Sequence, residues 1–149
     1  MSDELSELYQ QVILDHSRKP RNFRALPGAN RSSEGKNPFC GDHYTVFIQL
    51  EDGIIQDISF QGSGCAISKA SASMMTDFLK GKSVAEAEKI FGQYQEMVTT
   101  GPADGEALGK LCAFDGVRKF PMRVKCAILP WHAMMAGLKG QAVVSTEEK

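Results

Sequence analysis

Apolar residues recur at helical spacing in four long stretches of the chain and predict four helices. These helices are expected to cover about residues 3–18, 66–80, 84–99 and 126–139. Proline or glycine stands just beyond each of them, where helices usually end. Ser83, with Glu86 three residues later, predicts a capping box at the start of the third helix. Residues 103–120 add a shorter helical pattern.

Two stretches, residues 44–50 and 54–60, alternate between apolar and polar positions as half-buried β-strands do. Asp52-Gly53 between them has the composition of a tight turn, so the two stretches predict a β-hairpin. The apolar face of such a hairpin must be covered by other elements. Residues 19–37 show little periodicity and are interpreted as an extended connection with room for one short strand.

The chain has 149 residues, of which 42% are hydrophobic, and this composition suits one folded domain with its own core. We expect this domain to cover residues 1–140. Residues 141–149 are expected to form a flexible C-terminal tail.

The net charge of −1 gives no electrostatic reason to expect a nucleic acid or an anionic membrane as partner. No apolar run approaches the roughly 18 residues of a membrane span, and the acidic N-terminus does not resemble a secretory signal. We therefore expect a cytoplasmic protein in which thiols stay reduced. Its four cysteines, none in a C-x-x-C pair, are better interpreted as thiols or metal ligands than as disulfides.

A thiol and a carboxylate stand two residues apart in the irregular segment before the hairpin. Cys40 and Asp42 flank Gly41, and Pro38 precedes them. A soft sulfur and a hard oxygen that converge in one turn suit zinc or iron. On its own, the segment is better interpreted as a surface turn with an incidental cysteine.

Two more cysteines are expected at helix starts. Cys65 precedes the second helix, where free N–H groups and the helix dipole lower the pKa of a thiol, although a small buried side chain is the alternative. Pro130 is expected in the first turn of the last helix, because its missing N–H costs little there, and this places Cys126 at that helix start. The remaining candidates, Cys112, His16 and His132, are interpreted as packing residues.

Three cysteine motifs resemble, in order, those of the U-type iron–sulfur cluster assembly family (IscU, SufU and the N-terminal domain of NifU). They are Pro38-x-Cys40-Gly41-Asp42, Gly62-x-Gly64-Cys65-x-Ile67-Ser68 and Arg123-Val124-Lys125-Cys126. The SufU branch is the most similar, because the chain carries extra residues around 101–116 and has Lys125 where IscU has histidine. It also lacks the Leu-Pro-Pro-Val-Lys motif by which IscU binds its chaperone.

The resemblance implies an α+β fold: a small antiparallel sheet with helices packed on one face and a metal site at one end. It implies that Cys40, Asp42, Cys65 and Cys126 are metal ligands and that Cys40 also accepts sulfur. The implied partners are a pyridoxal-phosphate cysteine desulfurase of the SufS type, which supplies persulfide sulfur, and downstream cluster-assembly or apo iron–sulfur proteins.

Three functions stay open at this point. The first is a zinc-dependent sulfurtransferase or sulfur carrier, the second a scaffold for a [2Fe–2S] or [4Fe–4S] cluster, and the third a module in which zinc is only structural. Lys125 and the extra residues favour the first over the second. Asp42 weighs against the third, because structural zinc sites usually use only cysteine and histidine. Arg123 and Lys125 are candidates for a cation that offsets the negative charge of the site.

Overall fold

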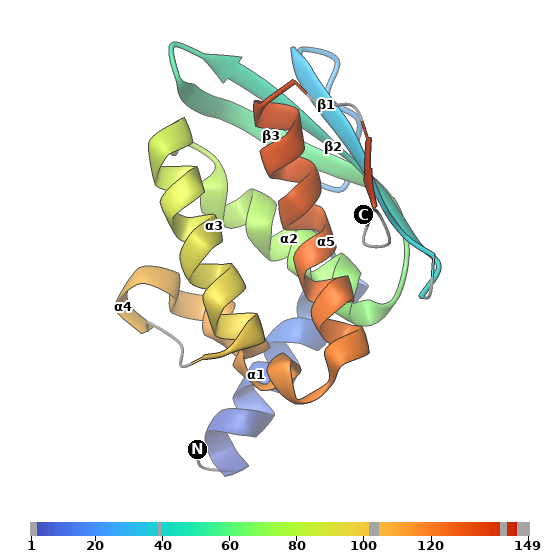
Figure 1. Cartoon of the computed structure of the whole chain (residues 1–149), viewed down its shortest axis with the longest axis vertical. Helices are drawn as coiled ribbons and strands as arrows, with labels where there is room; N and C mark the ends of the chain where they lie inside the picture. The colour runs from blue at the N-terminus through green and yellow to red at the C-terminus, as the bar shows by residue number, and fades with distance from the viewer. Residues whose placement is uncertain (1–2, 39, 102–104, 141–142, 146–149) are drawn as a thin grey trace.

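The computed structural model describes residues 3–38, 40–101, 105–140 and 143–145. Helices cover one face of a four-stranded sheet (Figure 1). The strands are β1 (Arg31–Asn37), β2 (Asp42–Glu51), β3 (Ile54–Ser63) and β4 (Val143–Ser145), and they lie in the order β3-β2-β1-β4. α5 (Pro121–Leu138) packs against β1 and β2, and α2 (Ala66–Leu79) packs against β3. This arrangement confirms the predicted α+β fold with helices on one face of the sheet.

Three of the strands pair with one another in antiparallel fashion, and the fourth joins the sheet in parallel. β1 (Arg31–Asn37) pairs with β2 (Asp42–Glu51), and β2 pairs with β3 (Ile54–Ser63), both antiparallel. The predicted hairpin is therefore confirmed. The extended connection contributes the seven-residue strand β1.

The segment expected to be a tail contributes β4 (Val143–Ser145), which pairs in parallel with β1. For these three residues the structure therefore differs from the expectation of a flexible tail, because their backbone joins the sheet edge. Residues 141–142 and 146–149 of the expected tail lie outside the described residues.

The first three long helices lie close to their predicted positions. They are α1 (Asp3–Arg18), α2 (Ala66–Leu79) and α3 (Val84–Thr99). Cys65 caps α2, and Ser83 and Glu86 form the predicted capping box of α3. A short helix α4 (Gly105–Leu108) and the 3₁₀-helical segment η1 (Gly109–Lys119) follow. None of the helices in the described part of the chain combines the length and hydrophobicity of a transmembrane segment.

The last helix, α5 (Pro121–Leu138), begins five residues earlier than predicted, and Pro130 lies in its interior. The prediction that Pro130 stands in the first turn, with Cys126 at the helix start, is wrong. Pro121 takes the place at the helix start that suits proline. Near Pro130, Ser71 Oγ and Tyr94 Oη donate hydrogen bonds to the carbonyl of Ala127. The carbonyl that loses its helical donor because of Pro130 is that of Cys126, four residues earlier, so these two bonds add donors to the next carbonyl rather than replace the missing one.

Buried hydroxyl groups of α2 fasten the neighbouring elements to it. Ser68 reaches Tyr44 of β2, Ser71 reaches α3 and α5, and Ser73 accepts a hydrogen bond from the backbone N–H of Arg21 at 2.8 Å. These serine residues are small enough for neighbouring elements to pack closely around α2. Their hydroxyl groups make hydrogen bonds to buried polar groups that cannot reach water.

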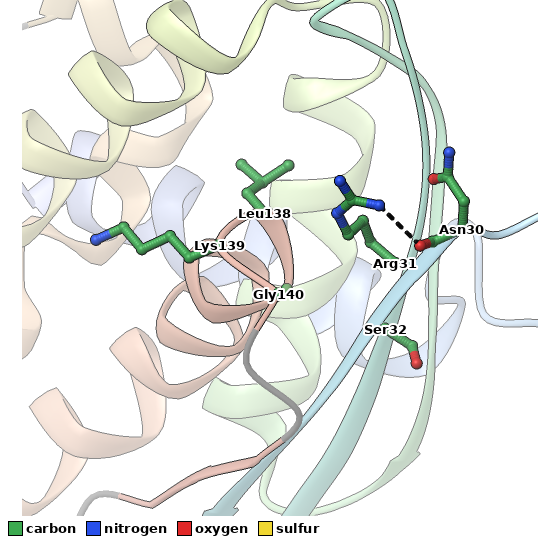
Figure 2. Close-up of a pocket in the computed structure, with 7 residues that line it drawn as sticks. Asn30, Arg31, Ser32, Leu138, Lys139 and Gly140 are labelled. Carbon is green, nitrogen blue, oxygen red and sulfur yellow. Dashed lines mark hydrogen bonds between the residues drawn. The ribbon is translucent and has the colours of Figure 1, made fainter.

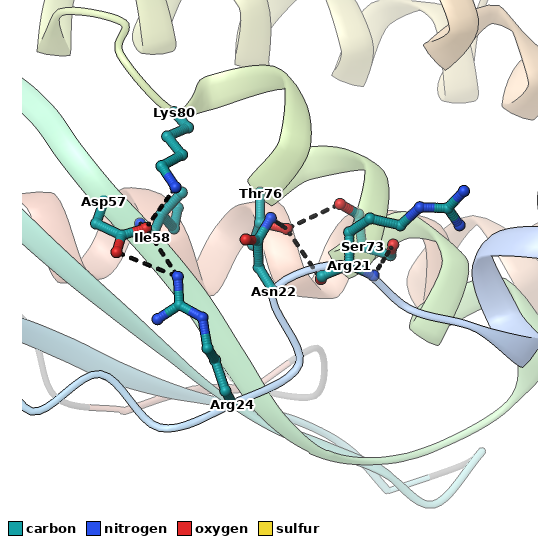
Figure 3. A network of polar contacts seen from close by, with 8 residues as sticks. All are labelled: Arg21, Asn22, Arg24, Asp57, Ile58, Ser73, Thr76 and Lys80. Atoms are coloured by element: carbon teal, nitrogen blue, oxygen red, sulfur yellow. Dashed lines mark hydrogen bonds and ion pairs between the residues drawn. The ribbon is translucent and has the colours of Figure 1, made fainter.

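The connection between α1 and β1 is held against β3 and α2 by a polar network (Figure 3). The backbone of Asn22 and Arg24 exchanges hydrogen bonds with Phe60, each at 3.0 Å. The guanidinium of Arg24 contacts the carboxylate of Asp57 at 3.1 Å, and the ammonium of Lys80 approaches it at 3.4 Å. Because these ion pairs are partly exposed, we attribute the position of the connection mainly to its backbone hydrogen bonds.

Candidate metal centre

Two residues that are close in the sequence, Cys40 and Asp42, meet the distant Cys126 of α5 where β1 ends and β2 begins. The ligand atoms of Cys40, Asp42 and Cys126 all lie within 4.8 Å of one another. Cys40 belongs to the segment before β2, Asp42 is the first residue of β2, and Cys126 lies in the second turn of α5. Two sulfurs and a carboxylate oxygen at such distances could hold one metal ion, and this donor set fits zinc or iron.

Asp42 is nearly inaccessible, with 2% of its surface exposed, and it is surrounded by hydrogen-bond donors. Its Oδ1 accepts from the backbone N–H of Cys65 at 2.9 Å and from Ser68 Oγ at 3.1 Å. Its Oδ2 accepts from Asn37 Nδ2 at 3.2 Å. These three donors hold the carboxylate in one orientation beside the thiols.

Cys65 lies beside this cluster at the N-terminus of α2. Its sulfur accepts a hydrogen bond from the backbone N–H of Ser68 at 3.5 Å. A hydrogen bond from the Cys126 thiol, supported by that of Ser68 and opposed by burial, lowers the pKa of Cys65 to about 6. The same interaction, together with burial, raises the pKa of Cys126. The structure thus brings Cys40, Asp42 and Cys126 to ligand distance, and it places Cys65 beside them through its backbone N–H, which donates to Asp42 Oδ1.

The setting of Cys126 differs from the prediction. Cys126 is the sixth residue of α5 and is fully buried, so it does not lie at the helix N-terminus as predicted. Its thiol contacts the carbonyl of Met122 at 3.6 Å. Arg123 is an exposed residue near the thiols, and the negative charges of Cys65, Cys126 and Cys40 raise the pKa of its guanidinium. Together with Lys125, it therefore stays a candidate for the cation that offsets the charge of the site.

Gly62 near the end of β3 and Gly64 in the loop that follows allow this segment to approach β2. A Cβ atom on Gly62 would lie 2.1 Å from the carbonyl oxygen of His43, and its φ of +140° disfavours other residues. A Cβ on Gly64 would lie 2.5 Å from Asp42 Oδ1. Glycine at these positions is therefore what lets Cys65 reach the carboxylate of Asp42.

The other predicted packing residues lie away from the cluster. Cys112 is buried in η1. The ring of His16 contacts Ser73 Oγ at 2.7 Å, and the ring of His132 packs edge-on against Phe91. Their interpretation as structural residues is confirmed.

Sequence reasoning missed Asn37, Ser68 and Tyr44, whose polar groups surround Asp42 or extend its hydrogen bonds. The hydroxyl of Tyr44 contacts Ser68 Oγ at 3.0 Å, and burial raises the pKa of Tyr44 to about 12. Only the nearness of Asn37 to Cys40 in the sequence could have suggested its role.

A surface cavity of about 370 Å³ lies between the start of β1 and the end of α5 (Figure 2). Its lining includes Asn30, Arg31, Ser32 and Lys139. β1 has seven residues, which span about 20 Å in a strand. The cavity is therefore at the other end of β1 from Cys40, Asp42 and Cys126 and does not belong to the same site.

Residues 8–127 match the family described as the NifU-like N-terminal domain. The chain belongs to this family. A member from Streptococcus pyogenes serotype M1, named iron–sulfur cluster assembly scaffold protein IscU, is 40% identical over 141 residues, which cover 93% of this chain and 87% of the relative. A member from Bacillus subtilis (strain 168), named zinc-dependent sulfurtransferase SufU, is 41% identical over 135 residues, 90% of this chain and 91% of the relative.

A solved structure of the NifU-like family has the same fold. It is a putative iron–sulfur cluster assembly scaffold protein for the SUF system from Fervidobacterium islandicum AW-1. It superposes with a TM-score of 0.83 at 33% sequence identity and covers 92% of this chain and 99% of its own. The resemblance seen in the three cysteine motifs is therefore confirmed at the level of the family.

Proposed function

We propose that this NifU-like protein is a zinc-binding sulfur acceptor in iron–sulfur cluster assembly. In this role it takes persulfide sulfur from a pyridoxal-phosphate cysteine desulfurase and passes it toward cluster assembly. The observation that carries the proposal is the convergence of the ligand atoms of Cys40, Asp42 and Cys126 within 4.8 Å of one another. The backbone N–H of Cys65 donates to the same Asp42 carboxylate.

In this proposal Cys40, Asp42, Cys65 and Cys126 together bind one zinc ion. Three sulfurs and one oxygen complete a tetrahedral set, and the acidic ligand is unusual for a purely structural zinc site. Bound zinc supplies the charge that keeps several neighbouring thiols deprotonated at neutral pH. Arg123 adds an exposed positive charge beside the same thiols.

Cys40 is the proposed sulfur acceptor because the resemblance to SufU implies this role, and its thiol, like that of Cys65, is more accessible than that of Cys126. It is half-buried and adjoins the exposed Gly41, whereas Cys126 is fully buried. In the transfer, the Cys40 thiolate attacks the outer sulfur of the persulfide on the desulfurase. A sulfur–sulfur bond forms at Cys40 while the bond in the desulfurase breaks, which leaves the desulfurase cysteine as a thiolate.

A thiolate that binds zinc is a poor nucleophile, so we further propose that the desulfurase provides a substitute ligand that releases Cys40. The protein with cobalt(II) in place of zinc tests this step, because sulfur-to-cobalt absorption reports the number of bound thiolates. Adding desulfurase should lower this absorption. Persulfide on Cys40 without any loss of absorption would contradict the exchange.

The scaffold function is the second candidate, and the name of the Streptococcus relative favours it. Anaerobic analysis of iron, zinc and acid-labile sulfide separates the two. One zinc per chain without labile sulfide supports the sulfur acceptor, whereas iron with equimolar sulfide supports the scaffold. Zinc without any effect on a desulfurase supports the structural module.

Desulfurase turnover, measured with and without this protein, tests the acceptor function. We expect strong stimulation that Cys40→Ser abolishes. Cys112→Ala is the matched control, because it removes a buried thiol of η1 outside the cluster and should keep the stimulation. Equal stimulation by wild type and Cys40→Ser would contradict the assignment of Cys40. We place this exchange in the cytoplasm, with apo iron–sulfur proteins as the final recipients.

A further inference from the structure

Asn37 occupies the end of β1 beside the candidate metal centre. It is the antiparallel pairing partner of Asp42, so the two side chains lie on the same face of the sheet. None of its surface is exposed. A carboxamide buried this completely must have its hydrogen bonds made within the protein.

The amide nitrogen of Asn37 faces two of the predicted ligands. Nδ2 lies 3.2 Å from Asp42 Oδ2 and 3.5 Å from Cys126 Sγ. Because an NH₂ group has two hydrogens, it can donate to both. The chemistry fixes this orientation, since a flipped amide would turn its oxygen toward a carboxylate that has no proton to donate.

This double hydrogen bond connects two elements that must meet for the site to exist. Asp42 belongs to β2 and Cys126 to α5, and Asn37 of β1 reaches both. Zinc(II) with three thiolates and one carboxylate has a formal charge of about −2, which is unfavourable in a buried place. Asn37 stabilises two of these anionic ligands without adding a competing ligand or a positive charge that repels the metal.

We propose that Asn37 is a positioning residue that holds Asp42 and Cys126 at ligand distance from each other and thereby determines the affinity of the site for metal. This inference rests on the proposed function, because it assumes that the two residues bind the same ion. It assigns no contact with the metal to Asn37 itself.

The test compares zinc affinity and the cobalt(II) spectrum of wild type, Asn37→Ala, Asn37→Ser and Asn30→Ala. Loss of a hydrogen-bonding partner of metal ligands typically weakens metal binding about 10–100-fold, and we expect this for Asn37→Ala, with an altered sulfur-to-cobalt band. Asn37→Ser keeps one donor and should lie between wild type and Asn37→Ala.

Asn30→Ala is the matched control at the other end of β1. Its side-chain amide also makes two hydrogen bonds, here to the backbone of one residue: Nδ2 donates to the carbonyl of Leu50 at 2.7 Å and Oδ1 accepts from the N–H of Leu50 at 2.8 Å. It is remote from the thiols, so Asn30→Ala should lower the melting temperature of the metal-free protein and leave zinc affinity within about threefold of wild type.

Wild-type zinc affinity and an unchanged cobalt spectrum in Asn37→Ala would overturn the inference. An equal loss of affinity in Asn30→Ala would also overturn it, because the effect would then be general to the sheet. If Asn37→Ala does not fold, Asn37→Ser decides, and wild-type affinity in that variant counts against the inference. Cys126→Ser checks the proposed function separately: if it binds zinc like wild type, the shared site is wrong whatever Asn37 does.

Discussion

Gly64→Ala places one methyl group in a crowded polar region beside the candidate metal centre. The added Cβ would lie 2.5 Å from Asp42 Oδ1, 2.6 Å from Ser68 Oγ and 2.7 Å from Tyr44 Oη. These distances are well inside van der Waals contact, so the three groups must move apart. Gly64 is not among the residues with positive φ, and the cost therefore comes from space rather than from backbone angles.

The magnitude follows from the hydrogen bonds that the methyl group disturbs. Asp42 Oδ1 accepts from Cys65 N at 2.9 Å and from Ser68 Oγ at 3.1 Å. Weakening such bonds to a buried carboxylate costs about 1.5–3 kcal/mol, and strain from overpacking adds about 1–3 kcal/mol. We expect unfolding free energy to fall by about 3–5 kcal/mol. In a chain of this length, the melting temperature should fall by at least about 6 °C.

Thermal unfolding of the metal-free protein, followed by circular dichroism, measures this effect. Gly92→Ala is the matched control, because Gly92 lies within α3 and its added Cβ would meet nothing within 4 Å. Alanine there should stabilise the helix by about 0.5–1 kcal/mol. A Gly64→Ala protein that melts at the wild-type temperature and keeps wild-type zinc affinity would refute the reasoning about close packing at the site.

Three further changes test other parts of the structure. Tyr94→Phe removes a 2.9 Å donor to the buried carbonyl of Ala127 and should lower the unfolding free energy by about 1–3 kcal/mol in urea, so an unchanged midpoint and slope would contradict the role of this bond. Burial lowers the pKa of His16 and of His132, so their contribution to stability is present above the unfolded value of about 6.5 and is lost as the pH falls through the folded values. His16→Gln should reduce the loss of unfolding free energy as the pH falls below about 6.5. An equal loss in the variant and the wild type would contradict this role of His16. Phe120, just before α5, is 61% exposed. Phe120→Asp should raise the concentration of this protein needed for half-maximal desulfurase stimulation several-fold without changing its zinc content. Identical saturation curves would exclude Phe120 from the contact with the desulfurase.

The hairpin and the helices α2 and α3 follow from local sequence because their signals are local. Alternation and a turn define β2 and β3, and a capping box defines the start of α3. The start of α5 was mispredicted because two prolines satisfy the same rule. Pro121 occupies the helix start, and Pro130 lies in the helix interior.

β1 lacks an apolar alternation for a reason that only the tertiary structure reveals. Its buried positions are Ser33, Gly35 and Asn37, because α5 packs directly on this strand. A Cβ on Gly35 would lie 3.1 Å from Leu129 Cδ1 of α5, so the position has little room for a larger residue. The buried positions of β1 therefore hold small or polar residues, and the strand lacks the alternating hydrophobic pattern by which strands are recognised.

The candidate site was predictable as a set of residues but not as an arrangement. The cysteine motifs named Cys40, Asp42, Cys65 and Cys126, although their wide separations in the sequence do not imply contact. Their proximity depends on strand pairing and on the packing of α5. Asn37 was missed for the same reason, since it meets Asp42 only across the paired strands.

Zinc K-edge X-ray absorption of the protein reconstituted anaerobically with one equivalent of zinc tests the central claim most directly. The account predicts three sulfur ligands at about 2.3 Å and one oxygen at about 2.0 Å. Asp42→Ala should remove the oxygen contribution of the carboxylate, and Cys126→Ser should remove one sulfur. A zinc ion with fewer than three sulfur ligands in the wild-type protein would contradict a shared site of Cys40, Asp42, Cys65 and Cys126.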